Sequence, residues 1–318
     1  MPERLLTPLD SDQRIAAQAT NGPVAVLAVA GAGKTRTIAH RIAYAVETGA
    51  QRAEAGLAIA YTTKAGAELR ARLGSLGVDA VNVATIHAVA LRQLNYFWPK
   101  ALPGTAWSVN SNRSQTLESL LDELNAELTA AERKLVLSEL EWAKASGLAI
   151  EDYLATERGP AQSHQALVGE LWQRYADHCT RLRQLDFDDV LQLLTGLLET
   201  RPDLALEARR RYSWFTVDEY QDFTPLMQAL LDQWLGDSRE LCVVGDPSQS
   251  IYEFAGSDAS LLSDFGKRFA DATIVELART YRCAAPIVAT AANLLERDAL
   301  RPLAHNAEGE VVVERFTD

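Results

Sequence analysis

The sequence predicts an α/β fold with a mainly parallel sheet, into which an all-helical subdomain is inserted. Short apolar segments alternate with helical patterns over most of the chain, which is typical of parallel strands covered by helices on both faces. Residues 105–185 interrupt this alternation, because they contain no convincing strand. The expected strands are Val24–Val29, Leu57–Tyr61, Ala80–Val83, Ser213–Val217, Leu241–Val244 and Thr273–Leu277.

The inserted block has the spacing of amphipathic helices throughout. Breaks at Pro103-Gly104 and Gly159-Pro160 punctuate it. The expected helices are Thr116–Leu128, Ala130–Ala145 and Gln162–Leu182. We therefore divide the chain into 1–104, the first half of an α/β domain; 105–185, the insertion; 186–278, the second half; and 279–318, which lies beyond that domain.

Composition points to a packed, unsecreted protein. The 318 residues are 47% hydrophobic, which is enough for a sizeable core and for two domains. Cys179, Cys242 and Cys283 lack metal-ligand spacing, which argues against a zinc site or a disulfide framework and fits a reducing cytoplasm. No apolar segment reaches the ~20 residues that span a bilayer, and the N-terminus lacks a signal-peptide pattern. A cytoplasmic location without a membrane partner is expected.

The net charge of −12 argues against nucleic-acid binding by bulk electrostatics. The charge is uneven: residues 1–100 carry 11 Lys and Arg against 7 Asp and Glu, whereas residues 186–318 carry 12 against 24. Any contact with a polyanion should therefore be local and made partly by stacking.

A glycine loop follows the first expected strand. In Ala30-Gly31-Ala32-Gly33-Lys34-Thr35-Arg36, backbone N–H groups at a helix N-terminus would cradle phosphate oxygens, Lys34 would bridge the outer phosphates and Thr35 would ligate Mg²⁺. The full pattern G-x-x-x-x-G-K-S/T is not met, since Ala28 occupies the first glycine position. Taken alone, the loop also fits a plain strand-to-helix turn.

Two adjacent carboxylates follow a later strand in Phe215–Asp222. Asp218 would hold Mg²⁺ through water, and Glu219 would polarise the attacking water. Together with the glycine loop, this pair supplies both halves of a site that hydrolyses ATP.

The ordered motifs resemble the UvrD/Rep/PcrA group of superfamily 1 DNA helicases, and they cover nearly the whole chain. Within His87–Pro99 the details resemble a second UvrD paralogue of actinobacteria. The matching segments are Leu9–Ala16 (glutamine motif), Ala30–Arg36 (phosphate loop), Tyr61–Leu69 (TFTNKAAxEM), Thr85–His87 with Leu91-Arg92 (TxH), Leu185–Leu191, Val217–Asp222, Val244–Tyr252 and Tyr281-Arg282.

The resemblance implies a RecA-like P-loop NTPase core and assigns further nucleotide contacts. Gln13 would read adenine, since an amide donates and accepts at once, although a lone glutamine is usually an exposed helix residue. By resemblance, Arg36 and Tyr281 would sandwich the adenine ring. Gln249 would sense the γ-phosphate, and Arg282 would act as an arginine finger.

DNA contact is expected at Tyr61, Lys64, His87, Tyr252 and Phe254. The last two are loop aromatics on which bases could stack, each worth ~1–3 kcal/mol, but two aromatics at this spacing fit a core equally well.

Lys64 and Arg92 are candidates for backbone phosphate contact, although a lone cation is usually just solvated.

The sequence departs from the family pattern in three segments. Val29 stands where the family has Gly, and Tyr61 where it has Phe, which keeps the stacking face. Ala255-Gly256-Ser257 replaces Arg-Gly-Ala, which removes one cation from the expected DNA surface.

The family continues with a second motor domain, whereas this chain ends at Asp318. We therefore expect 1–104 and 186–278 to form motor domain 1A, 105–185 to be insertion 1B and 279–318 to be a stub of motor domain 2A. A strand-like ending at Glu310–Phe316 without a partner favours a truncated chain.

The expected function is the N-terminal motor of an ATP-dependent, 3′-to-5′ DNA helicase that acts on single-stranded and junction DNA in repair. It would be a monomer that uses ATP and Mg²⁺ and meets repair proteins. Two alternatives stay open: an ATP-binding regulatory or scaffold module, and a P-loop enzyme of small molecules, which leaves the Gln249–Phe254 loop without a role.

Overall fold

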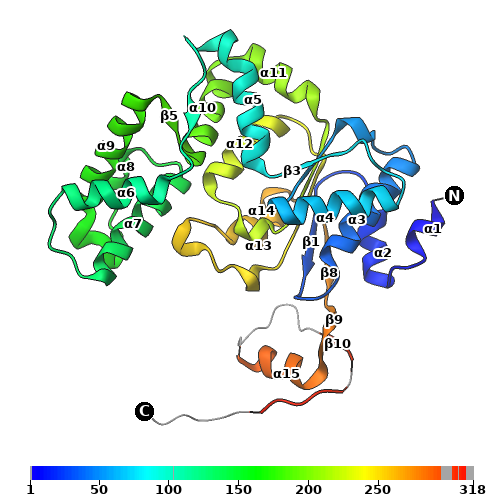
Figure 1. Ribbon diagram of the computed structural model, residues 1–318. Coiled ribbons are helices and arrows are strands. Elements are labelled where there is room, and N and C mark those ends of the chain that lie inside the picture. Colours follow the sequence, from blue (N-terminus) through cyan, green and yellow to red (C-terminus); the bar gives the residue numbers. More distant parts are fainter. Residues whose placement is uncertain (1, 103, 295–302, 307, 313–318) are drawn as a thin grey trace.

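The computed structural model describes residues 2–102, 104–294, 303–306 and 308–312. Its centre is a sheet of six parallel strands in the order β3-β2-β6-β7-β1-β8 (Figure 1). The α/β fold with a mainly parallel sheet is thus confirmed, and each of the six expected strands forms within two residues of its expected bounds. The strands are β1 (Val24–Ala28), β2 (Gly56–Ile59), β3 (Asn82–Ala84), β6 (Trp214–Val217), β7 (Leu241–Gly245) and β8 (Thr273–Leu277).

The register of the sheet brings the functional loops to one edge. Leu27 of β1 pairs with Gly245 of β7, and Ile59 of β2 pairs with Val217 of β6. The loops that follow these four strands therefore leave the sheet at its carboxyl-terminal edge, where open α/β sheets bind ligands.

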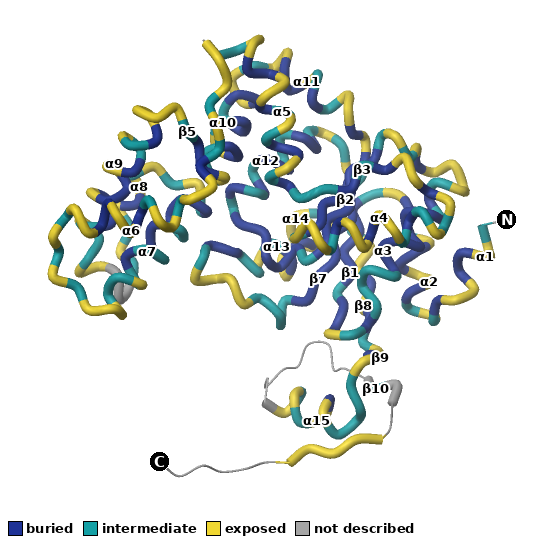
Figure 2. Tube along the Cα trace, in the orientation of Figure 1, coloured by how far each residue is buried: buried dark blue, intermediate teal, exposed yellow. Residues whose placement is uncertain are grey.

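Helices cover both faces of the sheet, as the alternating sequence pattern requires. Along β1, Ala25 faces a core shared with α5, α10, α11 and α12, whereas Val24 and Val26 face a core shared with α3 and α4. The four inner strands, β2, β6, β7 and β1, are buried along almost their whole length, whereas the edge strand β8 is largely exposed (Figure 2). The helices of this domain are α1 (Glu3–Leu6), α2 (Ser11–Gln18), α3 (Lys34–Glu47), α4 (Thr63–Ser75), α5 (Ile86–Ala101), α10 (Phe187–Thr200), α11 (Pro202–Arg211), α12 (Pro225–Leu235), α13 (Ser260–Ser263) and α14 (Phe265–Arg268).

The insertion is a helical body with its own core, in which Leu140, Val168 and Tyr175 are almost completely buried. Its helices are α6 (Arg113–Glu123), α7 (Ala130–Ala145), α8 (Ile150–Leu154) and α9 (Gln165–Leu182), and the short 3₁₀ segment η2 (Gly159–His164) precedes α9. Helix α7 begins where the sequence predicts, because Thr129 and Glu132 form a capping box.

The expectation that 105–185 contains no strand is wrong at both ends of the insertion. β4 (Ser108–Val109) and β5 (Gln184–Leu185) pair in parallel where the chain enters and leaves it. Two-residue strands carry no alternation that a sequence could reveal. They form because the two crossing segments run side by side and satisfy each other's backbone groups.

Beyond β8, the chain forms a small unit below the sheet (Figure 1). It consists of β9 (Arg279–Ala284), α15 (Ala285–Leu294) and β10 (Leu303–Asn306), and β10 pairs in parallel with β9. In the expected final strand, Glu310–Phe316, residues 310–312 have no regular structure and 313–316 lie outside the described residues.

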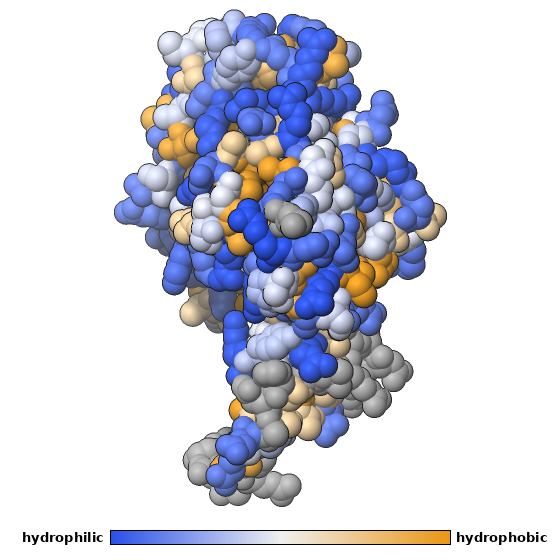
Figure 3. All heavy atoms as spheres, turned by 90° about the vertical axis from the view of Figure 1, so that its right-hand side faces the viewer, coloured by the Kyte–Doolittle hydropathy of each residue, from blue (hydrophilic) through white to orange (hydrophobic). Residues whose placement is uncertain are grey.

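The surface beside the N-terminal helices is mainly hydrophilic, with scattered hydrophobic groups (Figure 3). Within the described part of the chain, no helix is both long and apolar enough to cross a bilayer. Cys179, Cys242 and Cys283 are free thiols.

Candidate active site

The glycine loop lies between the end of β1 and the start of α3. Gly31 and Gly33 have φ angles of 78° and 83°, in the left-handed region that favours glycine. A side chain at Gly31 would also collide with β9, since its Cβ would lie 2.6 Å from Arg282 Cβ. The loop thus presents backbone to the N-terminus of a 14-residue helix, which is a ready site for phosphate.

The two expected halves of the site meet across the sheet edge. Lys34 Nζ, at the start of α3, lies 3.0 Å from Glu219 Oε2, just after β6. Glu219 has a φ of 51°, an uncommon conformation for a non-glycine residue that is enriched at functional sites. The structure therefore brings the loop lysine and the second carboxylate into direct contact.

Asp218 is buried next to this ion pair, with 6% of its surface exposed. Burial, and secondarily the charge of Glu219, raise the pKa of Asp218 to about 7, while Lys34 opposes the shift. Burial also raises the pKa of Asp222 to about 6. One carboxylate oxygen of Asp222 is buried without a hydrogen-bond partner. Three carboxylates thus share a single lysine.

This excess of carboxylate oxygens fits a bound cation. Mg²⁺ prefers oxygen ligands and keeps several of its waters. Among the described residues, no group of three or more His, Cys, Asp or Glu side chains could hold a metal ion by itself, so Thr35 and, through water, Asp218 stay the predicted ligands. A divalent ion would also relieve the electrostatic cost of burying ionised Asp218.

Gln221 links the carboxylates to the loop after β7. Its Nε2 donates to Glu219 Oε2 over 3.0 Å, and its Oε1 accepts from the Asp246 backbone N–H over 3.0 Å. Gln249 Nε2 in turn donates to Asp246 Oδ2 over 2.8 Å. Gln249, expected at the γ-phosphate, therefore reaches Glu219 through Asp246 and Gln221. Sequence alone assigns no role to Gln221, although it lies two residues after Glu219 in the segment Val217–Asp222.

Gln13 is 2% exposed, and its amide is engaged by the protein. Nε2 donates to the Ala32 carbonyl over 2.9 Å, and Oε1 accepts from Asp10 N in the capping box of α2. Gln13 thus holds the glycine loop against α2. Its contact with adenine stays a prediction.

Arg36, Tyr281 and Arg282 all lie close to the glycine loop. The Tyr281 hydroxyl donates to Asp10, and Arg36 donates to the Pro8 carbonyl, so both side chains meet the segment that precedes α2. Burial, with the hydrogen bond to Asp10, raises the pKa of Tyr281 to about 12. In β9, Tyr281 N donates to the Gly31 carbonyl over 3.0 Å, which sets Arg282 beside the glycine loop.

Three of the aromatic residues predicted to contact DNA form a row, which we call the aromatic surface: Tyr61, Tyr252 and Phe254. The Tyr61 and Tyr252 rings are 5.6 Å apart, and those of Tyr252 and Phe254 are 6.4 Å apart. Tyr252 is 37% exposed and Phe254 59%. The alternative that these two rings belong to the core is therefore wrong.

His87 lines a cleft of about 200 Å³ together with Tyr61 and Tyr252, so these predicted residues do come together. Burial lowers the pKa of His87, opposed by Asp188 and Asp186. Lys64 is exposed on the first turn of α4 and does not line this cleft. Arg92 lines a different cleft, described below.

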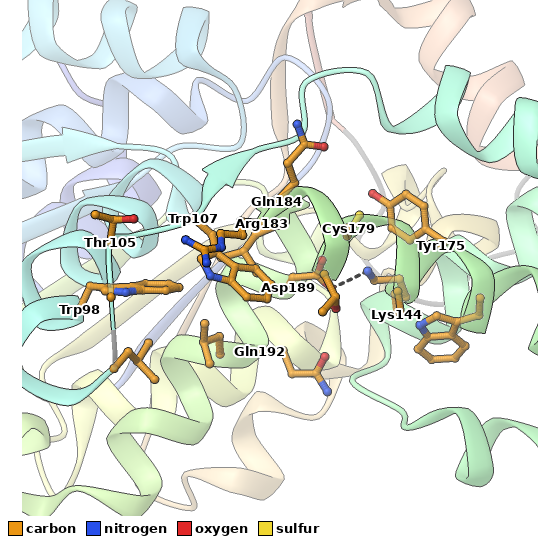
Figure 4. Close-up of a pocket in the computed structure, with 17 residues that line it drawn as sticks. Trp98, Thr105, Trp107, Lys144, Tyr175, Cys179, Arg183, Gln184, Asp189 and Gln192 are labelled. Carbon is orange, nitrogen blue, oxygen red and sulfur yellow. Dashed lines mark hydrogen bonds and ion pairs between the residues drawn. The ribbon is translucent and has the colours of Figure 1, made fainter.

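A cavity of about 750 Å³ lies away from the nucleotide site, at the base of the insertion (Figure 4). Beside it, Lys144 of α7 lies 2.6 Å from both Asp186 and Asp189 at the start of α10. Arg113 of α6 lies 2.6 Å from Asp188. These ion pairs attach the insertion to the sheet domain. Nothing in the sequence of Leu185–Leu191 indicates which residues pair with its carboxylates.

Comparison with known proteins identifies relatives of this chain. A family model described as the UvrD/REP helicase N-terminal domain matches residues 9–270. The chain is 39% identical over 301 residues to the ATP-dependent DNA helicase UvrD2 of Mycobacterium tuberculosis, covering 90% of this chain and 43% of that protein. It is 28% identical over 303 residues to the ATP-dependent DNA helicase PcrA of Bacillus subtilis, covering 94% of this chain and 41% of PcrA. The chain thus spans less than half the length of these curated relatives.

Proposed function

The chain belongs to the UvrD/REP helicase family, and from that membership we propose that it forms the ATP-binding motor domain of an ATP-dependent DNA helicase. The observation that carries this proposal is the 3.0 Å contact between Lys34 and Glu219 beside buried Asp218. A phosphate-binding lysine and a carboxylate pair at one sheet edge are the parts that phosphoryl transfer to water requires.

In this proposal, Lys34 and the backbone of the glycine loop bind the outer phosphates of ATP. Thr35 and, through water, Asp218 would hold Mg²⁺, which would supply charge neutralisation at the transferred phosphate. Glu219 accepts a proton from the attacking water and orients it, while Gln221 holds the carboxylate in place. Arg282, in the strand beside the loop, places positive charge at the γ-phosphate.

The aromatic surface supports single-stranded DNA as the track, since exposed rings can stack bases without regard to sequence.

We further propose movement in the 3′-to-5′ direction, action at junctions with duplex DNA, a cytoplasmic role in repair with repair proteins as partners, and a monomeric state. The 318-residue chain by itself should bind ATP·Mg²⁺ weakly and should not unwind DNA, because it spans less than half the length of its helicase relatives and closure of the site is what couples hydrolysis to movement.

A second candidate function is an ATP-binding regulatory module that does not move on DNA. It is favoured by the cleft beside Tyr61 and Tyr252, whose lining includes the acids Glu141, Asp188 and Asp222 and would repel phosphates. A regulatory module would bind ATP without unwinding any duplex.

Strand displacement separates these functions. The full-length gene product, supplied with ATP, should displace a strand from a duplex with a 3′ single-stranded tail and leave a 5′-tailed duplex intact. The 318-residue chain should displace neither. Displacement of the 5′-tailed duplex alone would contradict the polarity, and ATP binding without displacement of either would favour the regulatory module.

A further inference from the structure

A second cleft lies at the opposite edge of the sheet from the nucleotide site. It has a volume of about 700 Å³ and is lined by Asn82, at the start of β3, and by Tyr212, two residues before β6. Its other walls come from α5 and the end of α11. The glycine loop and the aromatic surface follow the carboxyl ends of strands, so neither shares this edge.

Positive charge gathers in this cleft. Arg92 of α5 and Arg210 and Arg211 of α11 line it, and all three are exposed. Its one carboxylate, Glu207, is taken up by neighbours: the Tyr96 hydroxyl donates to it over 2.6 Å and Lys100 Nζ over 2.7 Å. We call this the basic cleft.

Stabilisation of a helix C-terminus does not explain all three arginines of the basic cleft. Arginines in the last turn of a helix stabilise its dipole, and Arg209 has a structural bond as well, from Nε to the Gln233 carbonyl over 2.7 Å. Arg92, however, comes from the interior of a different helix. On a chain of net charge −12, the convergence of three guanidinium groups from two helices favours an anionic ligand.

The cleft also contains an aromatic ring on its surface. Tyr96 is 56% exposed, its hydroxyl is anchored on Glu207, and Lys100 Nζ lies 4.0 Å from its ring centroid. Exposed guanidinium groups beside a fixed ring suit a sugar–phosphate backbone, because arginine pairs with phosphate oxygens in a bidentate manner.

We propose that the basic cleft binds the phosphate backbone of DNA, as a second contact remote from the aromatic surface. The identity of the polyanion rests on the proposed function. Each phosphate contact should add ~0.9 to the magnitude of the slope of log K against log salt with duplex DNA, and ~0.7 with single strands.

The test is an Arg210→Ala/Arg211→Ala variant of the full-length gene product, titrated by fluorescence anisotropy against labelled duplex and single-stranded DNA over a range of salt. The slope of log K against log salt should fall by about 1.8 with a duplex, or by about 1.4 with single strands, for two lost phosphate contacts. Binding of fluorescent ATP and the thermal unfolding midpoint report whether the fold and the nucleotide site are intact.

An Arg201→Ala/Arg239→Ala variant is the matched control. It changes the net charge equally, but these arginines pair with Asp203 and Asp271 outside the cleft. Equal losses in both variants would overturn the proposal, since they would show a bulk charge effect. Unchanged slopes would also overturn it, as would tighter arginine-dependent binding of poly-glutamate than of DNA.

The experiment distinguishes failure of the proposal that the basic cleft binds DNA from failure of the proposed function. If the slope is unchanged in a protein whose ATPase is stimulated by DNA, only the DNA-binding role of the basic cleft is contradicted. If the slope is reduced in a protein whose ATPase does not respond to DNA, the basic cleft is supported and the motor function is contradicted. If the wild-type protein binds neither duplex nor single-stranded DNA, both proposals are contradicted.

Discussion

The nucleotide site and the aromatic surface lie on the same edge of the sheet but are built in opposite ways. In the nucleotide site, Asp218 is 6% exposed, and Glu219 is held by Lys34 and by Gln221. On the aromatic surface, Tyr252 and Phe254 are 37% and 59% exposed.

This difference in burial separates residues proposed to take part in hydrolysis from residues proposed only to bind DNA. Buried, paired charges interact strongly in a low dielectric, so a single substitution in the nucleotide site should change a rate or an affinity steeply. Exposed rings pack against little of the protein, so their loss should leave folding intact and weaken only a ligand.

Glu219→Gln should lower the turnover of the full-length gene product by about 10²–10⁴-fold while ATP binding is kept. The substitution removes the carboxylate that orients water but keeps the side-chain volume. Steady-state ATPase and fluorescent-nucleotide titration measure the two effects. Glu151→Gln, on α8 of the insertion, is the control and should change neither. Turnover near the wild-type value in Glu219→Gln would show that Asp218 and Glu219 are not the hydrolytic pair.

Lys34→Ala should weaken nucleotide binding by about 10–100-fold, the value of one hydrogen bond to a charged group. It removes the cation that faces the phosphates and leaves Glu219 beside Asp218 without its partner. Titration with a fluorescent ATP analogue measures the change, with exposed Lys134→Ala as the control. Equal affinities of Lys34→Ala and wild type would contradict the assignment of the glycine loop.

Tyr252→Ala/Phe254→Ala should lower single-strand affinity by about tenfold or more per ring, with little dependence on base sequence. Folding and ATP binding should be kept because both rings are exposed. Anisotropy and thermal unfolding measure these outcomes. Ile251→Ala, at an exposed apolar residue of the same loop, should lose far less affinity. Loss of the unfolding transition in the double variant would place the rings in the core after all.

The smallest expected effect is on stability as a function of pH. The pKa of Asp218 is raised to about 7 in the folded, nucleotide-free protein, so its contribution to stability is present at low pH and is lost as pH rises through about 7. Asp218→Asn, which does not titrate, should therefore gain a few degrees in Tm relative to wild type between pH 5 and pH 8. The Tm difference for Tyr252→Ala should not change over that range. Equal shifts in both variants would erase the contrast between buried and exposed groups.

Sequence predicted the parts of the site that local rules determine. Gly31, Gly33 and Lys34 follow a strand and open a helix, and together with the later Asp218-Glu219 pair that arrangement implies a phosphate loop. The six strands of the sheet were also predictable from their apolar character. These features depend on neighbours in the chain, which a single sequence displays.

What sequence could not provide is the pairing between distant segments. Nothing local indicates that Gln221 would join Glu219 to Asp246, or that Lys144 would pair with Asp186, 42 positions away. The β4–β5 pair is too short to show alternation, and the arginines of the basic cleft come from two helices far apart in the chain. Each of these contacts depends on how whole helices pack against the sheet.

The central claim is that the buried site hydrolyses ATP in response to DNA on the aromatic surface. The most direct test is the ATPase rate of the full-length gene product with and without saturating single-stranded DNA. A rate that DNA raises into the ordinary enzymatic range of roughly 1–10³ s⁻¹, and that Tyr252→Ala/Phe254→Ala no longer raises, is the predicted result. A rate unaffected by DNA would contradict the account.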